Sequence, residues 1–218
     1  MEMTEILKHV DHTLLKPYAQ WEDIKKLCEE AINYHTASVC VPPCYIRQIK
    51  DTFGERINIC TVAGFPLGYC VTEAKIAETK QAIADGASEI DMVINVCDVK
   101  NGKLDQVKEE IAALKKECGD LILKVIIETC YLNKEEKIAL CKAVTDAGAD
   151  YIKTSTGFGT AGASLEDIRL FQKHLGKGIK IKAAGGIRTK EDMEAYLQAG
   201  CDRIGTSSAI SLLSENKE

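Results

Sequence analysis

Four charged residues interrupt apolar segments that are otherwise typical of buried β-strands. Asp91, Lys124, Lys153 and Lys182 each directly follow an isoleucine or a leucine. Burying an unpaired charge is costly, so a chain rarely keeps such residues without a use for them. An amine beside a second amine and a carboxylate, acting without a metal ion, is a set of groups suited to forming a Schiff base with a carbonyl compound.

Lys153 is the expected nucleophile. An amine attacks a carbonyl only when it is unprotonated, and a free lysine has a pKa of about 10.4. A second ammonium about 4 Å away repels the first by roughly 4 kcal/mol at an effective dielectric constant near 20. We therefore expect Lys182 to favour a neutral amine on Lys153, while Asp91 opposes part of this effect and transfers protons. Lys180, at the start of the same strand-like segment as Lys182, is expected to be solvated.

Strand-like and helix-like segments alternate along the whole chain. Strands are predicted at Val10–Leu15, Ala37–Val41, Ile57–Ala63, Glu89–Asn95, Leu121–Glu128, Tyr151–Ser155, Ile179–Ala184 and Arg203–Gly205. Helices are predicted at Trp21–Tyr34, Thr72–Ala84, Leu104–Cys118, Lys134–Ala147, Ser164–His174 and Lys190–Ala199. This alternation predicts an α/β fold, a single (β/α)8 TIM barrel over residues 1–218 with a short N-terminal helix. The alternative is a doubly wound open sheet, but the sequence Leu-Lys-Pro-Tyr after the first strand lacks the usual glycine-rich turn.

The strand pattern predicts where the charged side chains point. Side chains alternate between the two faces of a strand, and both faces of a barrel strand are covered. The apolar faces most simply pack against the helices, which sends Asp91, Lys124, Lys153 and Lys182 into the lumen. Lys153 and Lys182 lie near the carboxyl ends of their strands, where barrel enzymes place their active sites.

Glycines after the last strands indicate a phosphate site. Gly185 and Gly186 precede Arg188 after the seventh predicted strand, and Gly205 precedes Ser207 at the eighth. Loops at these two positions commonly bind phosphate in this fold, because glycine lets backbone N–H groups approach an anion closely. Thr156 and Gly157, after the sixth strand, are placed to add another side of such a site.

Composition excludes several other classes of protein. The net charge of −5 argues against a nucleic-acid or anionic-membrane partner. No apolar run approaches the roughly 20 residues that span a membrane, and the N-terminus lacks a signal-peptide core, so a cytoplasmic location is expected. The four histidines are scattered and form no zinc pattern, and the ten cysteines contain no Cys-x-x-Cys pair, so free thiols are expected.

The charged segments and the glycine loops together resemble the deoxyribose-phosphate aldolase family. The resemblance runs in order through nearly the whole chain, in Asp11–Lys16, Gly64–Gly68, Glu89–Asn95, Lys124–Thr129, Lys153–Phe158, Ala184–Thr189 and Arg203–Ser208. The segments Glu-Ile-Asp-Met-Val-Ile-Asn and Lys-Thr-Ser-Thr-Gly-Phe are highly specific when they occur together.

The resemblance implies a class I aldolase that reversibly cleaves 2-deoxy-D-ribose 5-phosphate to D-glyceraldehyde 3-phosphate and acetaldehyde. It implies a Schiff base on Lys153 and proton transfer by Asp91 and Lys182. The implied substrate-binding residues are Asp11, Thr13, Lys124, Thr156, Gly157, Gly185, Gly186, Arg188, Gly205 and Ser207. Neither a metal nor another cofactor is expected; the expected partners are a phosphosugar and, as in many similar proteins, a second copy of the chain.

Some positions depart from the usual family pattern. Tyr69-Cys70-Val71 and Val96-Cys97-Asp98 replace smaller or more polar stretches, Phe158 stands where some relatives have lysine, and the chain ends without the tyrosine that some relatives use. We expect effects on turnover and pocket shape and none on the chemistry. Two alternatives stay open: another phosphate-binding barrel enzyme, such as a different Schiff-base aldolase or a transaldolase-like transferase, and a catalytically silent phosphosugar-binding barrel.

Overall fold

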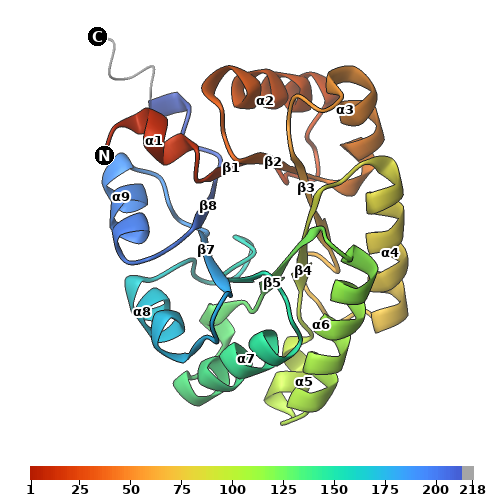
Figure 1. Cartoon of the computed structure of the whole chain (residues 1–218), viewed down its shortest axis with the longest axis vertical. Helices are drawn as coiled ribbons and strands as arrows, with labels where there is room; N and C mark the ends of the chain where they lie inside the picture. Colours follow the sequence, from red (N-terminus) through yellow and green to blue (C-terminus); the bar gives the residue numbers. More distant parts are fainter. Residues whose placement is uncertain (213–218) are drawn as a thin grey trace.

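Eight parallel strands form a closed barrel in the computed structural model, which describes residues 1–212 (Figure 1). Neighbouring strands pair in chain order, and β1 pairs with both β2 and β8, which closes the ring. The predicted TIM barrel is thus confirmed. The strands are β1 (Val10–Thr13), β2 (Ser38–Val41), β3 (Ile59–Ala63), β4 (Glu89–Val93), β5 (Ile122–Ile126), β6 (Tyr151–Lys153), β7 (Lys180–Ala184) and β8 (Arg203–Thr206).

Helices surround the strands (Figure 1). They are α1 (Met3–Leu7), α2 (Trp21–Tyr34), α3 (Ile46–Phe53), α4 (Thr72–Asp85), α5 (Val96–Lys100), α6 (Leu104–Cys118), α7 (Lys134–Asp146), α8 (Leu165–His174) and α9 (Lys190–Gln198). The expected short N-terminal helix is α1. The end of the chain, where some relatives carry a tyrosine, lies outside the described residues.

The sequence prediction differs from the structure in two respects. Helices α3 and α5 were not predicted, because α3 spans only eight residues and α5 only five, shorter than the window of about 11–18 residues over which a helical period is judged. Several predicted strands were too long at their carboxyl ends, and β5 ends at Ile126 rather than Glu128. The backbone of Glu128 is left-handed, with φ of +52°, so this residue cannot continue a strand.

Local sequence signals set several helix boundaries. Asn133 accepts a hydrogen bond from the backbone of Glu136, and the Glu136 side chain accepts one from the backbone of Asn133, which forms a capping box at the start of α7. Gly86 follows α4 and Gly200 follows the end of α9, with φ of +112° and +100°. Glycine reaches this left-handed conformation without a steric penalty, so it ends a helix sharply before the next strand.

The same strands separate two buried regions. Their outward side chains, such as Ile90, Leu123, Ile152 and Ile181, are almost completely buried in the main apolar core against the helices. Burying each such side chain stabilises the fold by about 1.5–3 kcal/mol. Their inward side chains include the charged residues described below. Two thiols also point inward, at Cys40 and Cys60, and belong to a separate small apolar cluster.

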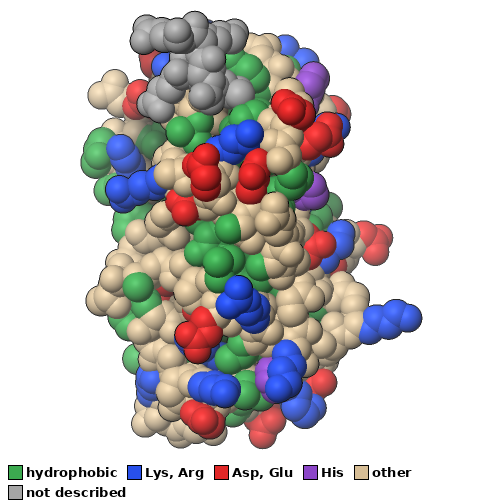
Figure 2. All heavy atoms as spheres, turned by 90° about the vertical axis from the view of Figure 1, so that its left-hand side faces the viewer, with side chains coloured by type: hydrophobic (Ala, Val, Ile, Leu, Met, Phe, Trp, Pro, Cys, Tyr) green, Lys and Arg blue, Asp and Glu red, His purple; other side chains and the backbone are tan. Residues whose placement is uncertain are grey.

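The outer surface is mixed in charge. In the face seen in Figure 2, acidic and basic side chains are interspersed with apolar ones. Within residues 1–212, no helix combines the length and the apolar character needed to cross a membrane.

Candidate active site

Four neighbouring strands bring the predicted catalytic groups together in the lumen. Asp91 of β4 pairs in register with Lys124 of β5, and Lys153 of β6 pairs with Lys182 of β7. Lys153 Nζ and Lys182 Nζ each lie 2.7 Å from Asp91 Oδ2, and Lys124 Nζ lies 2.8 Å from Asp91 Oδ1. The two amines on Oδ2 are thus at most twice that distance apart. The predicted lumen position of all four residues is confirmed.

Two further charged residues join this network and were missed in the sequence. Arg203 Nη1 pairs with Asp11 Oδ1 and Glu89 Oε2, and Glu89 also pairs with Lys124. Side-chain alternation could have placed both in the lumen. Glu89 lies two residues before Asp91 and Arg203 two residues before Gly205, so each shares the inward face of its strand. The complete lumen network holds three carboxylates and four cations: Asp11, Glu89 and Asp91 against Lys124, Lys153, Lys182 and Arg203.

Two of the carboxylates in this network, Asp91 and Asp11, are held ionised. Burial alone would raise the pKa of Asp91, but the ammonium groups of Lys124, Lys153 and Lys182 outweigh it and hold that pKa well below its ordinary value. Asp11 behaves in the same way: burial opposes ionisation, and Lys182, Lys124 and Arg203 together lower its pKa. Asp91 is therefore ready to accept a proton only when one of its cationic partners loses its charge.

Lys182 stays charged beside Lys153. Burial would lower the pKa of Lys182, but the carboxylates of Asp11 and Asp91 outweigh it and raise the pKa above its ordinary value. Repulsion between the two amines was expected from the sequence, whereas the structure places Asp91 between them, which offsets part of that repulsion. With every group ionised, the lumen network carries one positive charge in excess. Release of one proton would balance it. Lys153 lines the cavity described below, whereas Lys124 and Lys182 do not.

A thiol pair lies against the same carboxylate. The Cys60 thiol donates to Asp91 Oδ1 at 3.1 Å and accepts from Lys124 Nζ at 3.2 Å. Burial raises the pKa of Cys60, which keeps this thiol protonated and able to donate. Sulfur atoms of Cys40 and Cys60 and an oxygen of Asp91 lie within 4.8 Å of one another, but the lysine ammonium groups already neutralise Asp91 there. All ten cysteines are free, as predicted.

A cavity of about 370 Å³ opens above Lys153 at the carboxyl ends of the strands. The other predicted residues that line it are Thr13, Thr156, Gly157, Gly185, Gly186, Arg188, Gly205 and Ser207. Residues that were not predicted also line it, among them Leu14, Lys16 and Ser208. We call this space the reaction cavity.

Asp11 and Lys124 were expected to bind the substrate, and neither is among the residues that line the reaction cavity. Both side chains are completely buried. Asp11 accepts hydrogen bonds from Ser38, Lys182 and Arg203, and Lys124 pairs with Glu89 and Asp91. Both residues therefore belong to the lumen network.

The glycine loops of the reaction cavity have the conformation that close backbone approach requires. Gly157, Gly185 and Gly186 have φ of +86°, +86° and +77°. A Cβ on Gly185 would lie 3.0 Å from Gly162 Cα, so a side chain there would displace a neighbouring loop. Gly205 serves a different purpose, because a Cβ there would lie 3.1 Å from Lys182 Cε. It leaves room for the lysine side chain to cross the lumen.

An apolar cavity of about 420 Å³ lies beside the reaction cavity and shares Thr156 and Phe158 with it. Its lining includes Tyr69, Val96, Cys97 and Phe158, four of the residues at which the chain departs from the family pattern. Phe158 also contacts Phe65 edge to face, with ring centroids 5.3 Å apart. These four departures thus line one cavity at the barrel mouth, and none of them belongs to the lumen network.

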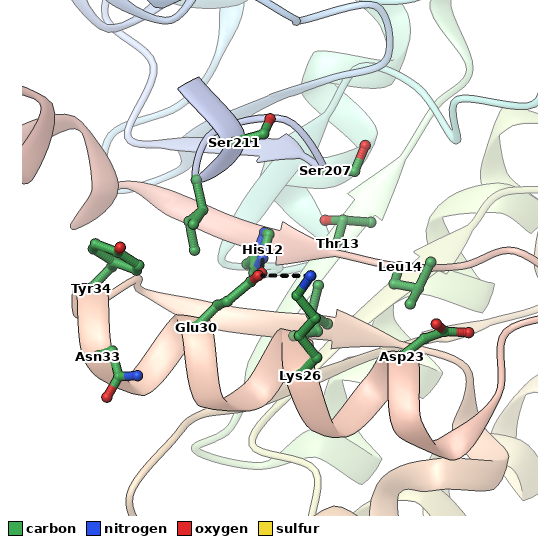
Figure 3. Close-up of a pocket in the computed structure, with 12 residues that line it drawn as sticks. His12, Thr13, Leu14, Asp23, Lys26, Glu30, Asn33, Tyr34, Ser207 and Ser211 are labelled. Carbon is green, nitrogen blue, oxygen red and sulfur yellow. Dashed lines mark hydrogen bonds and ion pairs between the residues drawn. The ribbon is translucent and has the colours of Figure 1, made fainter. Parts of the chain in front are cut away.

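A third cavity, of about 700 Å³, lies between β1, α2 and the segment after β8 (Figure 3). His12 of β1 points away from the lumen and pairs with Glu30 of α2, with Nε2 and Oε2 2.9 Å apart. Burial lowers the pKa of His12, although Glu30 acts against this. This cavity shares Thr13, Leu14 and Ser207 with the reaction cavity, but Lys153 does not line it. This cavity is therefore separate from the one into which the Lys153 amine opens.

Comparison with known proteins agrees with this geometry. Residues 6–214 match the family described as DeoC/LacD family aldolase. A deoxyribose-phosphate aldolase of Clostridium botulinum is 69% identical over 98% of this chain and 96% of its own length, and one of Clostridioides difficile is 54% identical over 97% and 96%. A solved putative deoxyribose-phosphate aldolase of Coccidioides immitis superposes with a TM-score of 0.94 at 38% identity, over 100% of this chain and 88% of that one. The chain therefore belongs to the DeoC/LacD family of aldolases.

Proposed function

We propose that this chain, as a single barrel domain, reversibly cleaves 2-deoxy-D-ribose 5-phosphate to D-glyceraldehyde 3-phosphate and acetaldehyde through a Schiff base on Lys153. The observation that carries the proposal is the convergence of Lys153 and Lys182 on one oxygen of Asp91, with Lys153 open to the reaction cavity. The names of the similar proteins support the choice of substrate.

Cleavage begins with the neutral amine of Lys153 attacking the aldehyde carbon of the open-chain sugar. Loss of water gives an iminium ion, whose positive charge draws electrons from the C2–C3 bond. That bond breaks as the 3-hydroxyl group gives up its proton to Asp91, directly or through water. Glyceraldehyde 3-phosphate leaves with a new carbonyl group, and the bonding electrons remain on the lysine as an enamine.

The enamine is then protonated at C2 and hydrolysed to acetaldehyde, which frees Lys153. Lys182 is suited to return this proton through Asp91, because its Nζ donates to the carboxylate oxygen that also accepts from Lys153. Asp11 holds the other side of Lys182. A proton relay of this kind contributes a factor of about 10²–10⁴ to the rate.

The phosphate group would lie against the loops that follow β6, β7 and β8. Gly157, Gly185 and Gly186 offer backbone N–H groups there, and Ser207 a hydroxyl. Lys16 and Arg188, both exposed at the rim, add positive charge. Phe158 stands where some relatives have a lysine, so these backbone groups carry more of the phosphate recognition.

The test is reductive trapping with borohydride in the presence of acetaldehyde, followed by peptide mapping. We expect one adduct, on Lys153, and we expect Lys153→Ala to lose both the adduct and all measurable aldolase activity while remaining folded. Lys180→Ala is the matched control, because Lys180 is exposed at the start of β7. An adduct on another lysine would contradict the proposal. The alternatives, a different Schiff-base aldolase or a transaldolase-like transferase, would be identified by analysing the products formed from two-carbon and three-carbon donors.

We also propose that the protein is a cytoplasmic homodimer. The ten free cysteines support a reducing compartment. A solved relative from Aeropyrum pernix, 30% identical with a TM-score of 0.89 over 100% of this chain and 93% of that one, is described as a tetramer, so assembly must be measured directly. Light scattering coupled to size exclusion separates a dimer from a monomer or a tetramer, and cell fractionation tests the location.

A further inference from the structure

Glu128 is a buried carboxylate that the proposed reaction does not use. Its side chain is 3% exposed, at the carboxyl end of β5. Its backbone has φ of +52°, a conformation that a residue with a side chain adopts at a cost of about 1–3 kcal/mol and keeps only where surrounding contacts enforce it. Such strain is common beside functional sites.

The shortest contacts of this carboxylate are with one residue of the reaction cavity, and a longer one joins Cys130 Sγ to Oε1 at 3.9 Å. Thr156 donates to Glu128 twice, through its hydroxyl group to Oε2 and through its backbone N–H to Oε1 at 3.2 Å. A Cβ on Gly159 would lie 3.1 Å from Glu128 Cδ, so the following loop packs closely against the carboxylate. Glu128 is therefore held in place from two sides.

These contacts fix the direction of the Thr156 hydroxyl group. A hydroxyl has one proton and two lone pairs. The proton is donated to Glu128, and one lone pair accepts from the backbone N–H of Phe158 at 3.0 Å. One lone pair remains, and Thr156 lines the reaction cavity together with Lys153. Toward a bound ligand this hydroxyl is consequently an acceptor and not a donor.

We infer that Glu128 is a positioning residue that makes Thr156 select a substrate hydroxyl group. The inference rests on the proposed aldolase function and adds a source of specificity to it. An acceptor aldehyde with a hydroxyl on C2, as in glyceraldehyde 3-phosphate, supplies the proton that the free lone pair of Thr156 accepts. A phosphate dianion supplies none, so Thr156 recognises the carbon chain while the glycine loops hold the phosphate.

Glu128→Gln reverses this polarity with almost no change in shape. A glutamine has one acceptor oxygen, and the backbone N–H of Thr156 can only donate to it. The amide NH₂ group then faces the Thr156 hydroxyl, which must turn its own proton into the cavity. The substrate hydroxyl would meet a donor instead of an acceptor. Because the backbone strain at position 128 is kept, the variant isolates the effect of the carboxylate.

The experiment measures kcat/KM for aldol addition of acetaldehyde to two acceptors, glyceraldehyde 3-phosphate and 3-phosphopropanal, which lacks the hydroxyl. Glu128→Gln should lower the value for glyceraldehyde 3-phosphate by about 10- to 100-fold, the loss expected when a buried hydrogen-bonding group is left without a partner. The value for 3-phosphopropanal should fall by less than about threefold. Equal losses for both acceptors would overturn the inference and leave Glu128 with a purely structural part.

Two further variants make the result independent of folding. In a Thr156→Val background, Glu128→Gln should have almost no additional effect on selectivity, because the hydroxyl through which it acts is gone; additive effects would contradict the inference.

The matched control is Glu135→Gln, because Glu135 is an exposed glutamate in the first turn of α7. Borohydride trapping on Lys153 should persist in Glu128→Gln. If the wild-type protein itself forms no adduct, the proposed function fails rather than this inference.

Discussion

The barrel strands present two buried faces with opposite character. On β4 and β5, Ile90 and Leu123 point outward into apolar contacts, whereas Asp91 and Lys124, one residue further on, point into a lumen held together by ion pairs. Both faces are equally inaccessible to water. Alternation along a strand is thus enough to place a stabilising core and a charged chemical centre within one residue of each other.

The two faces are stabilised by different interactions. The outer face gains free energy from burial itself, about 25 cal/mol per Å² of apolar surface. The inner face loses solvation on burial and recovers it only through ion pairs. Lys153 pairs with Asp91, each of the other six lumen charges pairs with two or more groups, and Asp91 alone bonds three lysines and a thiol. We therefore expect substitutions on the two faces to act on different quantities.

The largest effect is expected from Asp91→Asn. Loss of the relay should lower kcat by about 10²–10⁴-fold. It should also destabilise the fold, by about 3–5 kcal/mol, because Lys124 and Lys182 lose a buried partner. Steady-state kinetics and urea unfolding check the two effects. A variant that retained wild-type kcat would show that the lumen carboxylate is structural only, and the contrast between the faces would disappear.

Ile152→Ala tests the outward face of the strand that carries Lys153. Ile152 is completely buried against the helices, so its truncation should lower the free energy of unfolding by about 2–5 kcal/mol. We expect kcat to stay within about threefold of the wild-type value at temperatures where the variant is folded. Urea unfolding and kinetics below the melting transition check this. A large fall in kcat with intact folding would mean that the outer packing also sets the geometry of Lys153.

The contrast between the faces could be read from the sequence only in part. The spacing of Ile90, Asp91 and Met92 predicted the inward carboxylate, and β4, β6 and β8 begin at the predicted residues Glu89, Tyr151 and Arg203. The pairing of Arg203 with Glu89 depends on the register of strands far apart in the sequence, which no local pattern specifies. Glu128 was hidden for another reason: a left-handed backbone is not expected for glutamate, so the residue was assigned to the strand before it.

The smallest effect is expected from the pH dependence of stability. The pKa of Asp11 is lowered in the folded protein, whereas an unfolded aspartate titrates near 3.9. The unfolded chain therefore binds the proton first, so the contribution of Asp11 is complete above about pH 4 and declines as the pH falls toward its folded value. Each such carboxylate removes about 1.4 kcal/mol of stability per pH unit in that window.

Asp11→Asn should accordingly flatten the fall in stability below pH 4, while lowering stability at pH 7 because Lys182 and Arg203 each lose one ion-pair partner. Asp51→Asn, at an exposed position of α3, should leave the slope unchanged. Urea unfolding at pH 7, 4 and 3 measures all three proteins. If Asp11→Asn kept the wild-type slope, Asp11 would not be ionised by its lumen partners, and the inner face would owe its stability to packing in the same way as the outer one.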